Sequence, residues 1–283
     1  MRKVIWPLSL ALLLAGCGGG RMSEGEFQDR ARTVAGRWQD SLADRAWRRG
    51  FMPLESLEDG SRWERLPAWA SLSDHNGVWT LETDLPERAP RARELRWPDG
   101  SAQTVPLASA AEAYAKLSEP DGFIEEECPP AGCRKLRVTG AELGEVPLLT
   151  SRGRVRVPAW HFTVKGVEER FTRVAVHPSV ISPRPVPREG EHEEVTAFAP
   201  VPGEDRRLLL TYGHGDCDRT HGARAYETRH LVVVDVDVES GDGMCTLRLK
   251  IDQITVTLDA PLGDRVLLDA GNGLPVPPAS TSR

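Results

Sequence analysis

Two histidines and two aspartates lie within eight residues of one another, at His214, Asp216, Asp218 and His221. Imidazole and carboxylate groups are common ligands of Zn²⁺ and related cations. If this segment folded back on itself, three of the side chains could hold a metal ion and leave one coordination position for a water. Such a water supplies hydroxide for hydrolysis. The alternative is a hydrophilic turn between two strands, because Gly and Asp favour turns and the spacing matches no metalloenzyme motif.

Other signatures of catalysis do not occur in the sequence. It contains no Gly-x-Ser-x-Gly nucleophile elbow, no Ser-x-x-Lys motif with its partners, and no Gly-rich loop that would hold a phosphate. We therefore assign no catalytic residue, expect no cofactor, and favour a protein that is not an enzyme. The competing hypothesis is a metal-dependent extracytoplasmic hydrolase that uses the 214–221 segment.

The N-terminal part of the chain is rich in tryptophan, and these side chains could contribute to binding. An exposed indole stacks on sugar rings or anchors a protein partner, whereas a buried indole fills the interface between a helix and a sheet. The sequence favours burial and leaves a binding face open as an alternative for Trp38, Trp47, Trp63, Trp69, Trp79 and Trp97.

Four cysteines follow residue 100, and an even number in an exported protein is typical of disulfide bonds. Three pairings are possible. We prefer Cys128–Cys133, whose partners are joined by a Pro-Pro-Ala-Gly turn, and therefore Cys217–Cys245. Zinc thiolates are disfavoured, because such sites normally show two closely spaced pairs.

The first 22 residues predict export and a lipid anchor. A basic start at Arg2 and Lys3 precedes an apolar run over residues 4–14, which is too short to span a bilayer. The run ends in Leu-Ala-Gly-Cys, typical of a bacterial lipobox. We predict a signal peptide over residues 1–16, a lipidated Cys17 that carries palmitate-type chains, and a Gly-rich tether over 17–22. The protein is then expected on the extracytoplasmic face of the cell membrane.

Charge limits the possible partners. The 283 residues include 36 basic and 42 acidic side chains, for a formal net charge of −6. This balance argues against nucleic acid, which is bound by basic surfaces. The expected partners are the membrane, through the anchor, and a protein or polymer of the cell envelope.

Helix signals are strongest near the start of the mature chain. Ser23 and Glu26 form a capping box, and an apolar stripe predicts one helix that continues to about Gly50. A second capping box at Ser109 and Glu112 predicts a short helix that ends before Pro120. The stripe of the first helix comprises Phe27, Ala31, Val34, Trp38 and Leu42.

Alternating apolar residues predict strands over most of the remaining chain. We expect a mainly β protein with flanking helices, divided into an α+β N-terminal region at 23–118 and a disulfide-bonded β region at 119–276. The second region is expected to be a β-sandwich or barrel-like. A Pro- and Glu-rich linker is predicted at 181–206, with the acidic run from Glu189 to Glu194 as a solvated face, and a disordered tail at 277–283.

Two stretches resemble a known group of proteins. They are similar to segments of uncharacterised secreted lipoproteins of high-GC actinobacteria. The first stretch comprises residues 149–153 (LTSRG) and 157–164 (VPAWHFTV), and the second comprises residues 260–266 (APLGDRV). The likeness runs from about Trp38 to Val276. It implies the same export route and no established activity, and it assigns no site residues.

Overall fold

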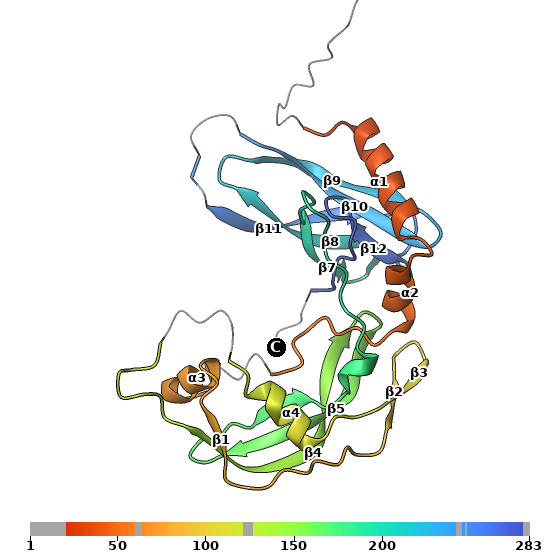
Figure 1. Cartoon of the computed structure of the whole chain (residues 1–283). Helices are drawn as coiled ribbons and strands as arrows, with labels where there is room; N and C mark the ends of the chain where they lie inside the picture. The colour runs from red at the N-terminus through yellow and green to blue at the C-terminus, as the bar shows by residue number, and fades with distance from the viewer. Residues whose placement is uncertain (1–20, 60–63, 121–126, 242–244, 247, 280–283) are drawn as a thin grey trace, which may run out of the picture. The chain divides into compact units, whose positions relative to one another are not determined.

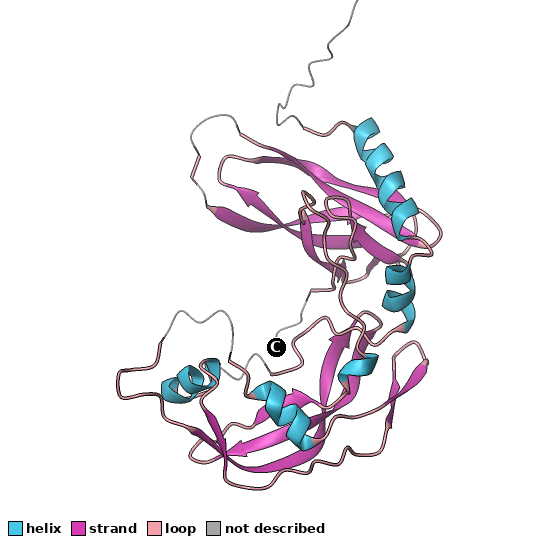
Figure 2. Ribbon diagram, in the orientation of Figure 1, coloured by secondary structure: helices cyan, strands magenta, loops and turns pink. Residues whose placement is uncertain are grey.

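The computed structural model describes residues 21–59, 64–120, 127–241, 245–246 and 248–279. The chain is mainly β, with 41% strand and 18% helix, as the sequence patterns predicted (Figure 2). It forms two compact units: unit 1 contains residues 1–37 and 187–283, and unit 2 contains residues 38–186. The predicted boundary at 118/119 does not coincide with this division. The reason is that β1 (Trp79–Leu81) pairs in parallel with β4 (Leu136–Thr150).

Unit 1 is built on two three-stranded sheets. One has the order β12 (Val266–Asp269), β10 (Leu231–Glu239), β9 (Arg219–Glu227), and the other β11 (Leu249–Thr257), β8 (Glu204–Gly215), β7 (Val195–Val201). Alternate valines of β10 pack against leucines of β8 in a shared core. The sandwich expected for the C-terminal part is therefore present, although β10 and β12 are parallel rather than consecutive antiparallel neighbours.

Two segments predicted to be irregular belong to this sandwich. β7 lies inside the expected linker at 181–206, since Val195 is buried even though its flanks are rich in Pro and Glu. Part of the expected disordered tail is also fixed: the Phe198 N–H donates to Pro277 O at 3.0 Å, and the Ala279 N–H donates to Phe198 O at 2.7 Å.

The first helix, α1 (Glu24–Trp38), runs alongside β9 and β10 (Figure 1). Its capping box is confirmed, because Ser23 Oγ accepts from the Glu26 N–H and the Glu26 carboxylate accepts from the Ser23 N–H. The prediction of one helix to Gly50 is wrong. The chain takes a left-handed turn at Asp40 (φ 58°), and a second helix, α2 (Leu42–Arg49), starts there, with Leu42 78% exposed.

Unit 2 contains a four-stranded sheet of order β1, β4, β5 (Gly153–Val164), β6 (Phe171–Val174). One face packs on α3 (Ala68–His75) and α4 (Ala110–Leu117), and the other on the hairpin of β2 (Arg93–Arg96) and β3 (Ala102–Val105). A short 3₁₀ turn, η2 (Pro178–Val180), follows. The hairpin closes at a Pro-Asp-Gly turn, and the predicted Ser109–Glu112 capping box is confirmed.

Both preferred disulfides are present. Cys128–Cys133 lies in unit 2 and Cys217–Cys245 in unit 1, with Cα–Cα distances of 5.1 Å and 6.0 Å. The predicted signal peptide, Cys17 and the predicted tether up to residue 20 lie outside the described residues. Within the described ranges, no helix combines the length and apolar character required to cross a bilayer.

Candidate functional site

The two histidines of the predicted metal segment lie on different strands and contact different carboxylates. His214 on β8 hydrogen-bonds through Nε2 to Asp252 of β11 at 2.8 Å, and this bond raises the pKa of the imidazole. His221 on β9 contacts Glu239 of β10 through Nε2, also at 2.8 Å. Each imidazole is therefore hydrogen-bonded through Nε2 to a different carboxylate.

The two aspartates of the same segment also have separate partners. Asp216 lies 2.8 Å from Lys250 Nζ, and this contact lowers the pKa of its carboxyl group. Asp218 accepts from the Gly215 N–H at 2.6 Å and closes the turn between β8 and β9. Among the described residues, no three His, Cys, Asp or Glu side chains are placed so that they could hold a metal ion. The structure does not bring the four predicted ligands together, and the turn alternative accounts for their contacts.

The described tryptophans are buried or partly buried. Trp38, Trp97 and Trp160 are buried, and no tryptophan in the described ranges is exposed. The half-buried rings have close neighbours: Trp79 packs edge-on against Phe171 at 4.8 Å between centroids. Trp63 lies outside the described residues. Burial in the core, which the sequence favoured, holds for Trp38 and Trp97, whereas Trp47, Trp69 and Trp79 are only partly buried.

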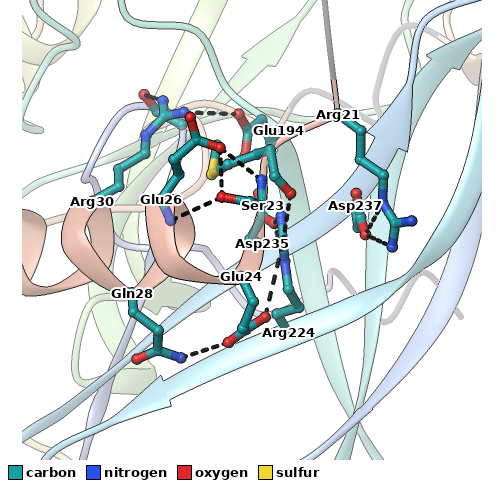
Figure 3. Close-up of polar contacts among 12 residues, drawn as sticks. Arg21, Ser23, Glu24, Glu26, Gln28, Arg30, Glu194, Arg224, Asp235 and Asp237 are labelled. Carbon is teal, nitrogen blue, oxygen red and sulfur yellow. Dashed lines mark hydrogen bonds and ion pairs between the residues drawn. The ribbon is translucent and has the colours of Figure 1, made fainter.

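Carboxyl groups are buried together in unit 1 (Figure 3). Asp235 on β10 is 2% exposed and Asp269 on β12 is 1% exposed. Arg224 of β9 donates through Nε to Asp235 at 2.8 Å, while Glu194, just before β7, lies 3.7 Å from Arg30 of α1. Two arginines therefore accompany three carboxyl groups in this cluster.

This excess of acid changes the proton affinity of the cluster. Burial raises the pKa of Glu194 to about 8, and contact with Asp235 and Asp269 adds to the effect. Burial also raises the pKa of Asp269 to about 6, although three or more backbone N–H groups favour its charged form. Glu194 is thus mostly protonated at neutral pH and can share its proton with Asp235. The predicted solvated acidic face does not include this residue.

The same face of β10 fixes the start of the described chain. Arg21 donates through Nε (2.8 Å) and Nη2 (2.6 Å) to Asp237 Oδ2, and this contact lowers the pKa of the aspartate (Figure 3). Arg224 Nη1 donates to the Met22 carbonyl at 2.9 Å. The last two residues of the predicted tether, Arg21 and Met22, are thereby attached to the sandwich.

A different site lies at one edge of the unit 2 sheet. A surface pocket of about 550 Å³, here called the basic pocket, is lined by Thr80, Leu81, Glu82, Arg134, Lys135, Arg137 and Lys165. Four of these side chains are cationic and one is a carboxylate, in a chain whose net charge is −6. This local excess of positive charge opposes the balance of the whole protein.

Local structure places these cations side by side. The Cys128–Cys133 disulfide and the tight turn that it closes precede Arg134 directly, and the Ser73 hydroxyl donates to Arg134 O at 2.6 Å. Lys165 follows β5, and its N–H donates to Arg137 O at 2.9 Å. Antiparallel pairing of β4 with β5 therefore joins two basic segments that are almost thirty residues apart in sequence.

The cations are accessible, and at least one is held in orientation. The side chains of Arg137 and Lys165 are 52% and 60% exposed, and both contact Glu82, which is 25% exposed. The Arg134 guanidinium lies 3.9 Å from the centre of the Trp69 ring. A guanidinium stacked in this way loses less freedom when it binds an anion. The arrangement can bind phosphate or carboxylate groups, and the described lining offers no nucleophile–base pair.

Sequence reasoning missed both the basic pocket and the buried cluster. A signal existed for each: the run Arg134-Lys135-Leu136-Arg137 directly after a disulfide, and Asp235 and Asp237 inside a valine strand. Carboxylates on a buried strand require cationic partners.

No protein-family model matches the chain, and comparison with curated proteins and with solved structures gave no match either. The likeness to actinobacterial lipoproteins therefore stays a prediction from the motifs quoted above.

Proposed function

We propose that this protein is a lipid-anchored, extracytoplasmic binding module of the bacterial cell envelope, without catalytic activity. Cys17 holds it at the membrane, and the basic pocket of unit 2 binds an anionic component of the envelope. The observation that carries the proposal is the pocket itself: four clustered cations against one carboxylate in an acidic protein.

The chemistry of the pocket favours a polymer with repeated phosphate or carboxylate groups. Arginine binds such groups through two parallel N–H donors, and lysine binds them as a point charge. Leu81, which is 43% exposed, adds an apolar contact at the pocket wall. The two disulfides suit an oxidising compartment, where such polymers are found.

The test is titration calorimetry of the full chain in detergent at low ionic strength. The probes are poly(glycerol phosphate), polygalacturonate and, as a neutral polymer, dextran. We expect binding of at least one polyanion, weakened by salt, and none of dextran. Comparison of the two polyanions identifies whether phosphate or carboxylate is preferred.

Variants connect the binding to the pocket. The double substitution Arg134→Gln and Lys165→Gln removes two surface contacts worth up to about 1 kcal/mol each, so affinity should fall about tenfold. Arg156→Gln is the matched control, because Arg156 is an exposed cation of β5 that pairs with Glu145 and does not line the pocket. Binding of neither polyanion, or equal losses in both variants, would reject the proposal.

A further inference from the structure

The strand β11 forms one edge of its sheet in unit 1. Among the described strands, β8 alone pairs with it, over Leu249–Thr257. Residues 249–253 are all exposed, and Leu249 and Ile251 are 69% and 58% exposed, which places them among the most exposed large apolar side chains described. A long edge strand with exposed apolar residues is a template for pairing with another strand.

The two faces of this half-strand differ in character. Leu249 and Ile251 alternate onto one face, where they cover Gly213 of β8: a Cβ added at Gly213 would lie 3.0 Å from Leu249 Cδ1. Lys250 and Asp252 alternate onto the other face, and each is held by a contact within the chain. Lys250 pairs with Asp216, and Asp252 with His214. Two fixed charges of opposite sign therefore flank Ile251.

We infer that β11 is a self-association surface, which pairs antiparallel with β11 of a second copy about a two-fold axis at Ile251. In this register Ile251 faces Ile251 of the second copy, and Lys250 faces Asp252 of the second copy on the same side of the sheet. Directly opposed residues have Cβ atoms about 4.5–5.5 Å apart, so both charge pairs form at once. A two-fold interface requires such a self-complementary pattern.

Charge decides between this register and its neighbours. An axis at Lys250 would oppose lysine to lysine, and an axis at Asp252 would oppose aspartate to aspartate, and like charges directly opposite destabilise a pair. Two other charged groups lie on this face: Asp216 beside Lys250, and His214 beside Asp252. Each copy contributes both groups, so they do not change the preference for the axis at Ile251. The outcome is a continuous sheet of six strands across two copies.

The interface is short, so pairing in dilute solution should be weak. Confinement of copies to one membrane raises their effective concentration and favours the pair. The inference does not depend on the basic pocket, although a pair would present two such pockets to one polymer.

A cysteine on the proposed axis tests the pairing in the full, membrane-bound chain. Opposed Cα atoms in an antiparallel pair lie about 4.5–5.5 Å apart, which suits a disulfide. The four described cysteines are already bonded in pairs, so Ile251→Cys supplies the reactive thiol. The matched control is Leu249→Cys, because Leu249 lies on the same face and is 69% exposed against 58% for Ile251. Its counterpart in the second copy lies four residues out of register and beyond disulfide reach, over about 7 Å.

We expect mild oxidation to give about tenfold more covalent dimer with Ile251→Cys than with Leu249→Cys, seen on non-reducing gels. Circular dichroism establishes that both variants are folded. Adding Lys250→Asp to Ile251→Cys should lower the dimer yield several-fold, because aspartates then oppose each other. Equal yields from the two cysteine variants, no dimer from a folded Ile251→Cys, or its capture of a different protein would each overturn the inference.

Discussion

Replacement of Glu194 by Gln isolates the effect of the buried carboxyl cluster on stability. In the folded chain the pKa of Glu194 is about 8, against an ordinary value of 4.5. Glutamine has the shape of the protonated side chain, stays neutral at every pH, and keeps an N–H donor that can face Asp235. The variant therefore reproduces the low-pH form of the wild-type cluster under all conditions.

The sign of the effect follows from proton binding. The folded state holds this proton more tightly than the unfolded state, so its stabilising contribution is complete below pH 4.5 and is lost as pH rises through about 8. Each unit of pKa difference corresponds to about 1.4 kcal/mol, so the loss of unfolding free energy between these two pH values is at most about 5 kcal/mol. Above pH 8 we expect Glu194→Gln to be more stable than wild type by about 2–5 kcal/mol, and below pH 4.5 the two should be similar.

The readout must report on unit 1. All described tryptophans lie in unit 2, so indole fluorescence would follow the wrong unit. Hydrogen exchange of the β10 amides, measured by mass spectrometry from below pH 4.5 to above pH 8 and corrected for intrinsic rates, reports the local unfolding free energy. Glu193→Gln removes an exposed neighbouring carboxyl and is the control. If the difference between Glu194→Gln and wild type stays constant across this range, the reasoning about buried charge is refuted.

Three further predictions follow from single features. Cys17→Ser should move the protein from the membrane to the soluble fraction of the native host, because the lipid loses its thiol; continued sedimentation with membranes would contradict the anchor. Asp235→Asn should cost about 3–5 kcal/mol, since Arg224, whose side chain is 14% exposed, loses its buried charge partner and keeps the more distant, exposed Glu24; unchanged β10 exchange would show that the pair is dispensable. Serine at both Cys217 and Cys245 should cost about 2–4 kcal/mol in the same assay; full protection would argue against a stabilising disulfide.

Features set by neighbouring residues could be predicted from the sequence. The capping boxes at Ser23 and Ser109 each depend on a glutamate three residues later, and the β2–β3 hairpin depends on its Pro-Asp-Gly turn. The two disulfides could also be predicted. The turn between Cys128 and Cys133 indicates that these two cysteines pair, and Cys217 and Cys245 are then the only pair left among the four. In each case the interaction that determines the structure lies within a few residues.

Features that depend on distant pairing could not be predicted. Glu194 is buried only because β10 and β12 place Asp235 and Asp269 beside it, and nothing in its Pro- and Glu-rich surroundings indicates burial. The basic pocket requires β4 and β5 to bring Lys165 to Arg137. The predicted metal segment failed to assemble for the converse reason, since partners from β10 and β11 occupy its histidines.

The discontinuity of unit 1 has a consequence for the order in which the chain can acquire its structure during synthesis. Unit 2 is complete within one uninterrupted stretch, so its sheet needs nothing beyond residue 186. During synthesis α1 emerges early, yet Gly271, whose carbonyl accepts from Arg30, emerges more than two hundred residues later. Until then the apolar side of that helix lacks its native cover, and the incomplete unit 1 is open to aggregation.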